Sequence, residues 1–188
     1  TASNVNGKVS FNNDRLLIEA NKANIKDISA SKVIVDLNGL IAVGVGSGLV
    51  EVDSIGPLKT ILEYIEEDPI NVKEVGFDRK NANGLVDSKV VIKFPLKQEV
   101  TSDEFDVTVK ATIKDAQLPN IVSGLPITGG PFDFSYSDGE ILISGDGQLA
   151  NRAINFKWDQ NINTDTANLT ADITVDSGLR KAFGVDLE

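Results

Sequence analysis

The chain of 188 residues contains no cysteine, no histidine and no methionine. It can therefore form neither a disulfide nor a thiolate or imidazole metal site, and most nucleophile–base pairs of enzymes are missing as well. We expect no enzyme, no catalytic residues, no bound metal and no cofactor. Because a complete translation product starts with methionine, we also expect the chain to be an excerpt of a longer protein.

Positive charge and long apolar runs are scarce too. The 18 Lys and Arg residues face 28 Asp and Glu residues, which gives a formal net charge of -10. Such a chain repels polyphosphates, so we expect no nucleic acid among its partners. No stretch approaches the roughly 18 to 20 apolar residues of a membrane span, and any anchor or export signal is expected outside these residues.

The motifs that suggest a site in isolation fail when their spacing is checked. The acidic clusters at 66–68 and 103–104 stand in polar surroundings that favour ordinary, solvated carboxylates. The Asp- and Asn-rich stretches that begin at Asp133 and Asp159 lack the glycine and the final glutamate of an EF-hand loop. The glycines of 145–147 have no phosphate-loop lysine beside them, and we interpret them as strand bends, bulges or close backbone contacts.

The dominant signal is an alternation of apolar and polar residues, which is typical of a strand with one buried face. Residues 106–114 read DVTVKATIK, and the same alternation recurs at 154–158 and 168–176. We expect the apolar side chains of these segments to share one face of a sheet. They are Val107, Val109, Ala111, Ile113, Ile154, Phe156, Leu169, Ala171 and Ile173.

Similar period-2 segments cover most of the chain. The predicted strands are 7–11, 14–21, 32–38, 41–45, 48–52, 73–79, 85–96, 104–115, 131–136, 139–145, 147–150, 152–159 and 168–176. Turn sequences rich in Asn, Asp and Gly separate them at spacings that suit an antiparallel meander.

Two segments show helical periodicity instead. The first, near 56–66, is an amphipathic helix expected to lie on the sheet by its apolar side. Its apolar positions are Leu58, Ile61, Leu62 and Ile65. The second is short, near 177–183, with Ser177 as its predicted N-cap and Gly184 as its stop. The fold predicted is mainly β: an elongated, curled antiparallel sheet, forming a groove or an open β-sandwich, with these two helices.

The chain also resembles itself in places. Residues 31–37 are similar to 88–94, and residues 23–27 to 111–115. We expect a single elongated β-rich domain over 1–188. Matches this short can arise by chance; if they are real, sub-repeats near 1–76 and 77–188 add strands along one axis.

Two interpretations of the apolar strand faces remain open from the residues alone. The faces can form half of the core of a closed β-sandwich, the usual destination of an apolar sheet face. They can also line a groove, whose branched aliphatic side chains suit acyl chains because they offer apolar contact without hydrogen bonds.

Several motifs in a fixed order resemble the YhdP branch of the AsmA-like proteins of Gram-negative bacteria. The segment 82–96, ANGLVDSKVVIKFPL, looks like the strand of that family that ends in an apolar residue followed by Pro-Leu. The segments that resemble the family's other passages are 56–62 before this strand, and 105–109, 113–116, 139–149, 156–158 and 179–186 after it.

This resemblance implies an inner-membrane-anchored protein that spans the periplasm and moves phospholipid between the inner and outer membranes, in support of envelope integrity. The nine apolar residues named above would then be candidates for the lining of its hydrophobic groove. The implied partners are phospholipid acyl chains, other segments of the same long chain, and both membranes through parts outside these residues. The alternative is a closed β-sandwich that serves the cell envelope as an interaction or structural module.

Overall fold

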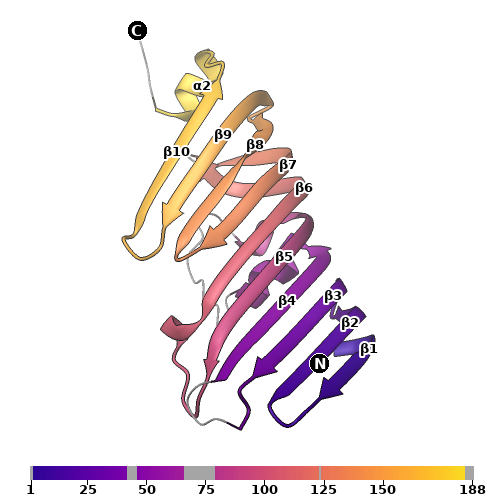
Figure 1. Ribbon diagram of the computed structural model, residues 1–188. Coiled ribbons are helices and arrows are strands. Elements are labelled where there is room, and N and C mark those ends of the chain that lie inside the picture. The colour runs from indigo at the N-terminus through magenta and orange to yellow at the C-terminus, as the bar shows by residue number, and fades with distance from the viewer. Residues whose placement is uncertain (1, 42–45, 66–78, 123, 185–188) are drawn as a thin grey trace.

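A computed structural model of the chain describes residues 2–41, 46–65, 79–122 and 124–184 (Figure 1). These residues form one ten-stranded antiparallel sheet, in which every strand pairs with its neighbours in sequence. The strands are β1 (Ala2–Phe11), β2 (Arg15–Ile25), β3 (Ile28–Asn38), β4 (Gly46–Pro57), β5 (Asn83–Leu96), β6 (Asp106–Val122), β7 (Leu125–Ser137), β8 (Glu140–Leu149), β9 (Arg152–Asn161) and β10 (Thr166–Ile173). The helices are α1 (Leu58–Ile65) and α2 (Ser177–Ala182), with short 3-10 turns η1 (Arg79–Asn81) and η2 (Ser102–Glu104).

The predicted fold class is confirmed: the chain is mainly β, with an open antiparallel sheet and two short helices. The alternative of a closed β-sandwich is wrong for the described residues, because all of their strands belong to one sheet. The helix predicted near 56–66 is α1, and the one predicted near 177–183 is α2. The latter ends before Gly184, whose φ of 70° is the left-handed conformation expected of a helix stop.

Most strand boundaries extend beyond the predicted ones. The predicted strands at 139–145 and 147–150 are one strand, β8, while those at 41–45 and 73–79 lie largely outside the described residues. The strand predicted at 168–176 ends at Ile173.

The predicted N-cap of α2 is also wrong. Asp176 caps this helix, and its carboxylate accepts a hydrogen bond of 2.9 Å from the backbone N–H of Leu179. Ser177 is instead the first helical residue. The guanidinium of Arg152 donates to the same carboxylate and holds it in the capping position.

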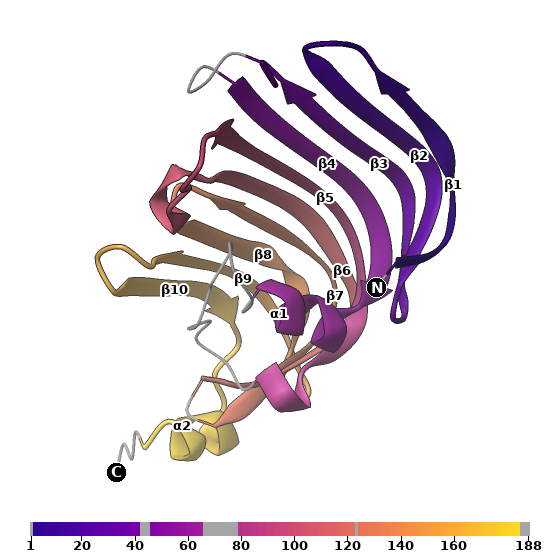
Figure 2. The same ribbon diagram turned by 90° about the horizontal axis from the view of Figure 1, so that it is seen from below.

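The strands bend along their length, and α1 lies inside the bend (Figure 2). We call the face toward α1 the inner face and the opposite one the outer face. Leu58 and Leu62 of α1 are buried in the same apolar cluster as Val86 of β5 and Ile113 of β6, which places these strand residues on the inner face. Directly paired residues of neighbouring strands share a face, so the register assigns the remaining side chains.

The two self-similar segments lie at the same level of the sheet. Residues 31–37 belong to β3 and residues 88–94 to β5, on either side of β4. Val33 and Val90, which correspond in the two segments, both pair with Val52. Whether they are sub-repeats stays a prediction.

Phe132 of β7 is among the largest fully buried side chains of the described residues and belongs to the apolar cluster that includes residues of β5–β9. Its ring meets that of Phe156 edge to face, with centroids 5.0 Å apart. A Cβ atom on Gly145 or on Gly147 would lie 2.9 Å from atoms of the Phe132 ring. The interpretation of residues 145–147 as a close backbone contact is therefore confirmed: the missing side chains make room for the ring.

Replacing Phe132 should show how much of the stability depends on this packing. We expect Phe132→Ala to lower the free energy of unfolding by about 3 to 5 kcal/mol, since it leaves a cavity. Phe11→Ala, at a phenylalanine that is 72% exposed, should change it by less than about 0.5 kcal/mol. Urea denaturation measures both, and equal losses would contradict this account of the core.

Candidate apolar ligand-binding face

The register aligns apolar side chains of the inner face into rows that run across the strands. One row crosses six strands, β1 to β6, and every member is β-branched. We call it the six-residue row; it consists of Val9, Ile18, Val35, Val50, Ile92 and Val107. A parallel row beside it continues the apolar surface with Ala20, Val33, Val52, Val90 and Val109.

A third row borders the six-residue row on its other side. It consists of Phe11, Leu16, Leu37, Gly48 and Phe94. The ring of Phe94 occupies the position that a side chain on Gly48 would need, so the aromatic surface covers the gap at the glycine. The ring of Phe105, the residue before β6, lies beside that of Phe94, with centroids 5.4 Å apart. Over β2–β5 the inner face is therefore apolar in three adjacent rows.

The chain leaves much of this surface partly open. In the six-residue row, Val9 is 64% exposed at the sheet edge and Val107 is 7% exposed at the other end. The four members between them, on β2–β5, are half-buried. Valine and isoleucine have few rotamers, so such a wall loses little side-chain entropy when something packs against it.

The outer face of the same strands has a different pattern. Leu49 lies between Asp36 on one neighbouring strand and Lys93 on the other. Ile34 lies in the same way between Glu19 and Glu51. Charged side chains thus interrupt every apolar row, and an apolar ligand could not lie across this face without desolvating them.

Ion pairs tie these outer-face charges together. Arg15 donates to both carboxylate oxygens of Asp36, at 2.7 and 2.8 Å, and Lys32 donates to Glu51 at 2.9 Å. The hydrogen bond from Arg15 lowers the pKa of the Asp36 carboxyl, and the hydrogen bond from Lys32 lowers that of Glu51. The outer face is thus a charged, solvated surface.

All nine residues selected from the sequence lie on the inner face, as the pairing of β6, β9 and β10 shows. Their accessibility differs, however. Buried by the chain itself are Val107, Ile113, Ile154 and Phe156. Half-buried are Val109, Ala111 and Ile173, and exposed are Leu169 and Ala171. Their role in a groove stays a prediction, and the buried four contribute to packing.

The accessible part of the apolar surface, on β2–β5, was not predicted from the sequence. The segment 33–37 reads VIVDL, with apolar residues on both faces, so its alternation is weak. The difference between the faces becomes visible only across strands, where Val35 is beside Val50 and Ile34 is beside Glu51. The signal that could have found it is the pairing of these strands.

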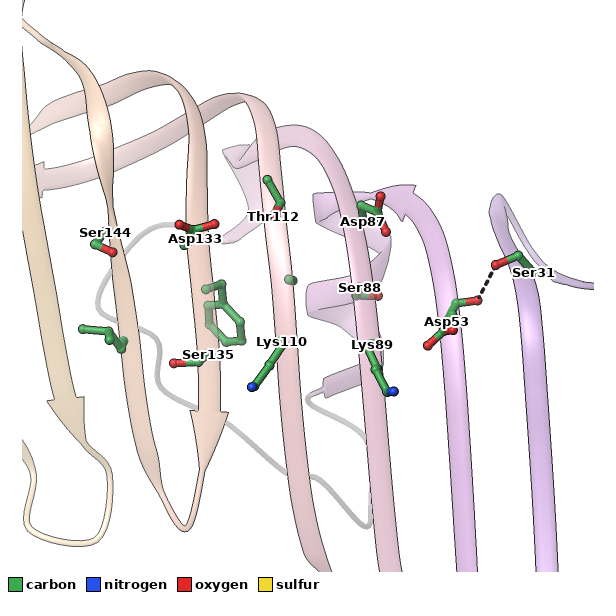
Figure 3. Close-up of a pocket in the computed structure, with 13 residues that line it drawn as sticks. Ser31, Asp53, Asp87, Ser88, Lys89, Lys110, Thr112, Asp133, Ser135 and Ser144 are labelled. Atoms are coloured by element: carbon green, nitrogen blue, oxygen red, sulfur yellow. Dashed lines mark hydrogen bonds between the residues drawn. The ribbon is translucent and has the colours of Figure 1, made fainter.

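The outer face also has a shallow depression of about 740 Å³ over β3–β8. Lys89 and Lys110 project from β5 and β6 beside Asp53, Asp87 and Asp133 (Figure 3). This lining of both signs selects neither anions nor cations. Across the described ranges, no three Asp or Glu side chains gather closely enough to hold a metal ion.

Neither α1 nor α2, the α-helices of the described residues, has the length and apolarity needed to cross a membrane. No protein-family model matches the chain, and no curated protein or solved structure matches it significantly.

The link between Arg15 and Asp36 predicts a titration. We expect Arg15→Gln to raise the pKa of the Asp36 carboxyl toward its ordinary value, as measured by NMR. Because this pKa is lowered in the folded chain, the ion pair stabilises the fold above the unfolded-state pKa, and this stability is lost as the pH falls through the folded-state pKa. As a matched control, Lys32→Gln should raise the pKa of Glu51 and leave Asp36 unchanged. An unchanged Asp36 in Arg15→Gln would contradict the assignment.

Proposed function

We propose that the inner face of β2–β5 binds the acyl chains of phospholipids, and that the chain is a non-enzymatic segment of a protein that moves phospholipid between the two membranes of a Gram-negative envelope. The observation that carries the binding proposal is the contrast between the two faces of the same strands. Apolar rows are continuous and partly open on the inner face, whereas charges interrupt them on the outer face.

The dimensions of the six-residue row suit an acyl chain. Its accessible members, from Val9 on β1 to Ile92 on β5, cross five strands and span about 19 Å at a spacing of about 4.8 Å, since Val107 is buried by the chain. The hydrocarbon core of a bilayer is about 30 Å thick, so one acyl chain needs about 15 Å. An acyl chain can therefore lie along the row, across the strands, in continuous contact with branched aliphatic side chains.

The expected affinity for an acyl chain is low, which suits a lipid that moves along the inner face better than one that is held there. Complete burial of about 14 methylenes at about 0.8 kcal/mol each would contribute about 11 kcal/mol. An open face covers only about half of that surface, which leaves about 5 kcal/mol before ordering costs. This is less than the roughly 8 kcal/mol of a micromolar complex. A chain held this weakly, without hydrogen bonds, can slide from one position to the next.

The proposed location in a Gram-negative envelope is supported by a different observation from the one that supports lipid binding. It comes from the ordered motifs that resemble the YhdP branch of the AsmA-like proteins, such as the strand segment 82–96 and the passage 139–149. These segments form β5 and β8 in the open sheet. In this proposal the chain is anchored in the inner membrane by parts outside these residues and lies in the periplasm.

Site-specific crosslinking tests the binding face. A photo-activatable amino acid at Val35 should capture phospholipid in cells, because this side chain lies in the middle of the six-residue row. The same amino acid at Ile34 is a matched control, since it is the preceding residue, is also half-buried, and points to the outer face. Mass spectrometry identifies the adducts. Protein adducts alone from Val35, or equal lipid capture at both positions, would refute the proposal.

A pair of substitutions on β5 tests the same face by affinity. We expect Ile92→Asn to weaken phospholipid binding about tenfold, since an amide covered by an acyl chain loses about 1 to 3 kcal/mol of hydrogen bonding to water. Val91→Asn, its neighbour on the outer face, should bind as the unmodified chain does. Binding is measured with a fluorescent phospholipid, and urea denaturation checks that both variants fold.

The reverse ranking of the two variants would place the lipid on the outer face. Equal affinities in two folded variants would show that lipid binding does not depend on the six-residue row.

A further inference from the structure

The parallel row beside the six-residue row does not end at Val109. The register of the second half of the sheet extends it, so that it crosses the inner face from β2 to β10, and we call it the long row. Its members on β7–β10 are Tyr136, Ile141, Gln160 and Ala167. From Ala20 to Val109 every side chain of the long row is aliphatic, and after Val109 come a phenol and an amide. The apolar part of the row thus leads into a part that can form hydrogen bonds.

The neighbouring row adds an indole to this part of the inner face. Trp158 lies two residues before Gln160 on β9, on the same face and about 7 Å away. Tyr136, Trp158 and Gln160 are all half-buried, while Ile141, between Tyr136 and Gln160 in the long row, is 3% exposed. A ligand here therefore meets the three amphipathic side chains rather than the isoleucine. The strands that carry them, β7 and β9, are paired on both sides.

The polar groups of this site are neutral and available. Within the described part of the chain, the indole N–H of Trp158 and the side-chain amide of Gln160 bond to no other residue, and neither is fully buried. The one charged side chain of the described inner face of β7–β9 is Arg152, about 20 Å from Trp158 along β9 and bonded to Asp176. Hydrogen-bond donors without a cation suit a neutral carbonyl oxygen better than a phosphate, whose charge would lack a partner.

We propose that Tyr136, Trp158 and Gln160 bind the glycerol-ester region of a phospholipid, one of whose acyl chains lies along the long row toward β3. This site rests on the proposed function and adds an orientation to it. From Tyr136 on β7 to Val33 on β3 the long row spans about 19 Å, and an acyl chain needs about 15 Å. The members of the row on β3–β6 are half-buried, so the chain can reach them.

The residue types fit this part of a lipid. Tryptophan and tyrosine are enriched at the level of a bilayer between acyl chains and headgroups, because each joins an apolar ring to a hydrogen-bonding group. A few placed polar groups in an apolar site fix the orientation of its ligand. Here they direct the ester end of the lipid toward β9 and the methyl end toward β3.

Fluorescence tests the orientation, because Trp158 is the only tryptophan of the chain. Phospholipids with a nitroxide near the ester end or near the methyl end of an acyl chain are bound to the unmodified chain. We expect strong quenching of Trp158 by the ester-end label and weak quenching by the methyl-end label, which lies about 15 Å further along the row. Equal quenching by the two bound lipids, stronger quenching by the methyl-end label, or none by either would overturn the proposal.

A ligand without ester carbonyls tests the hydrogen bonds. We expect Gln160→Leu to weaken binding of a diester phospholipid about threefold to tenfold, because a hydrogen bond is lost, and to leave binding of the diether analogue unchanged. Gln148→Leu makes the same substitution at an exposed residue on the outer face of β8 and should change neither affinity. Displacement of a fluorescent phospholipid measures the affinities, and urea denaturation checks that both variants fold.

The outcomes separate this site from lipid binding itself. If neither phospholipid binds the unmodified chain, the proposed function fails and the ester site fails with it. If both bind, and folded Gln160→Leu weakens them equally or not at all, lipid binding stands and the ester site is refuted.

Discussion

The structure depends on one constraint, the antiparallel pairing of each strand with the next along the chain. Among the described residues, ten strands joined in order form a single open sheet, because none of these strands returns to cover its face. Each pairing also fixes a register, and the registers together place side chains from distant parts of the sequence in common rows. The six-residue row joins residues as far apart as Val9 and Val107.

A single open sheet is not stabilised by a second sheet packed against its face. In this chain, the two halves of the sheet are stabilised by different interactions. In β5–β9 the inner face is a packed core, where Phe132 fills the space above Gly145 and Gly147 and meets Phe156. In β2–β5 the backbone ladder and outer-face ion pairs, such as that between Arg15 and Asp36, accompany an inner face that remains half-buried. The partly open surface is thus attached to a well-packed part of the same sheet.

The fold class followed from the period of the sequence, since alternation is a local property that each strand shows independently. The strand at 106–114 and the helix near 56–66 were predictable for this reason. The accessible surface was not predictable in the same way. Burial of Val107 and exposure of Leu169 depend on what lies beside each strand, and the alternation in both segments is equally clear. Likewise, Asp176 rather than Ser177 caps α2 because Arg152, distant in sequence, holds its carboxylate.

The central claim is that lipid contacts one face of β2–β5, and NMR of methyl groups with a spin-labelled phospholipid tests it most directly. The spin label broadens the signals of methyl groups close to it. The account predicts broadening at Val35, Val50 and Ile92 of the inner face, while Ile34 and Leu49 on the outer face of the same strands stay sharp. Equal broadening on both faces, or broadening confined to Ile34 and Leu49, would contradict it.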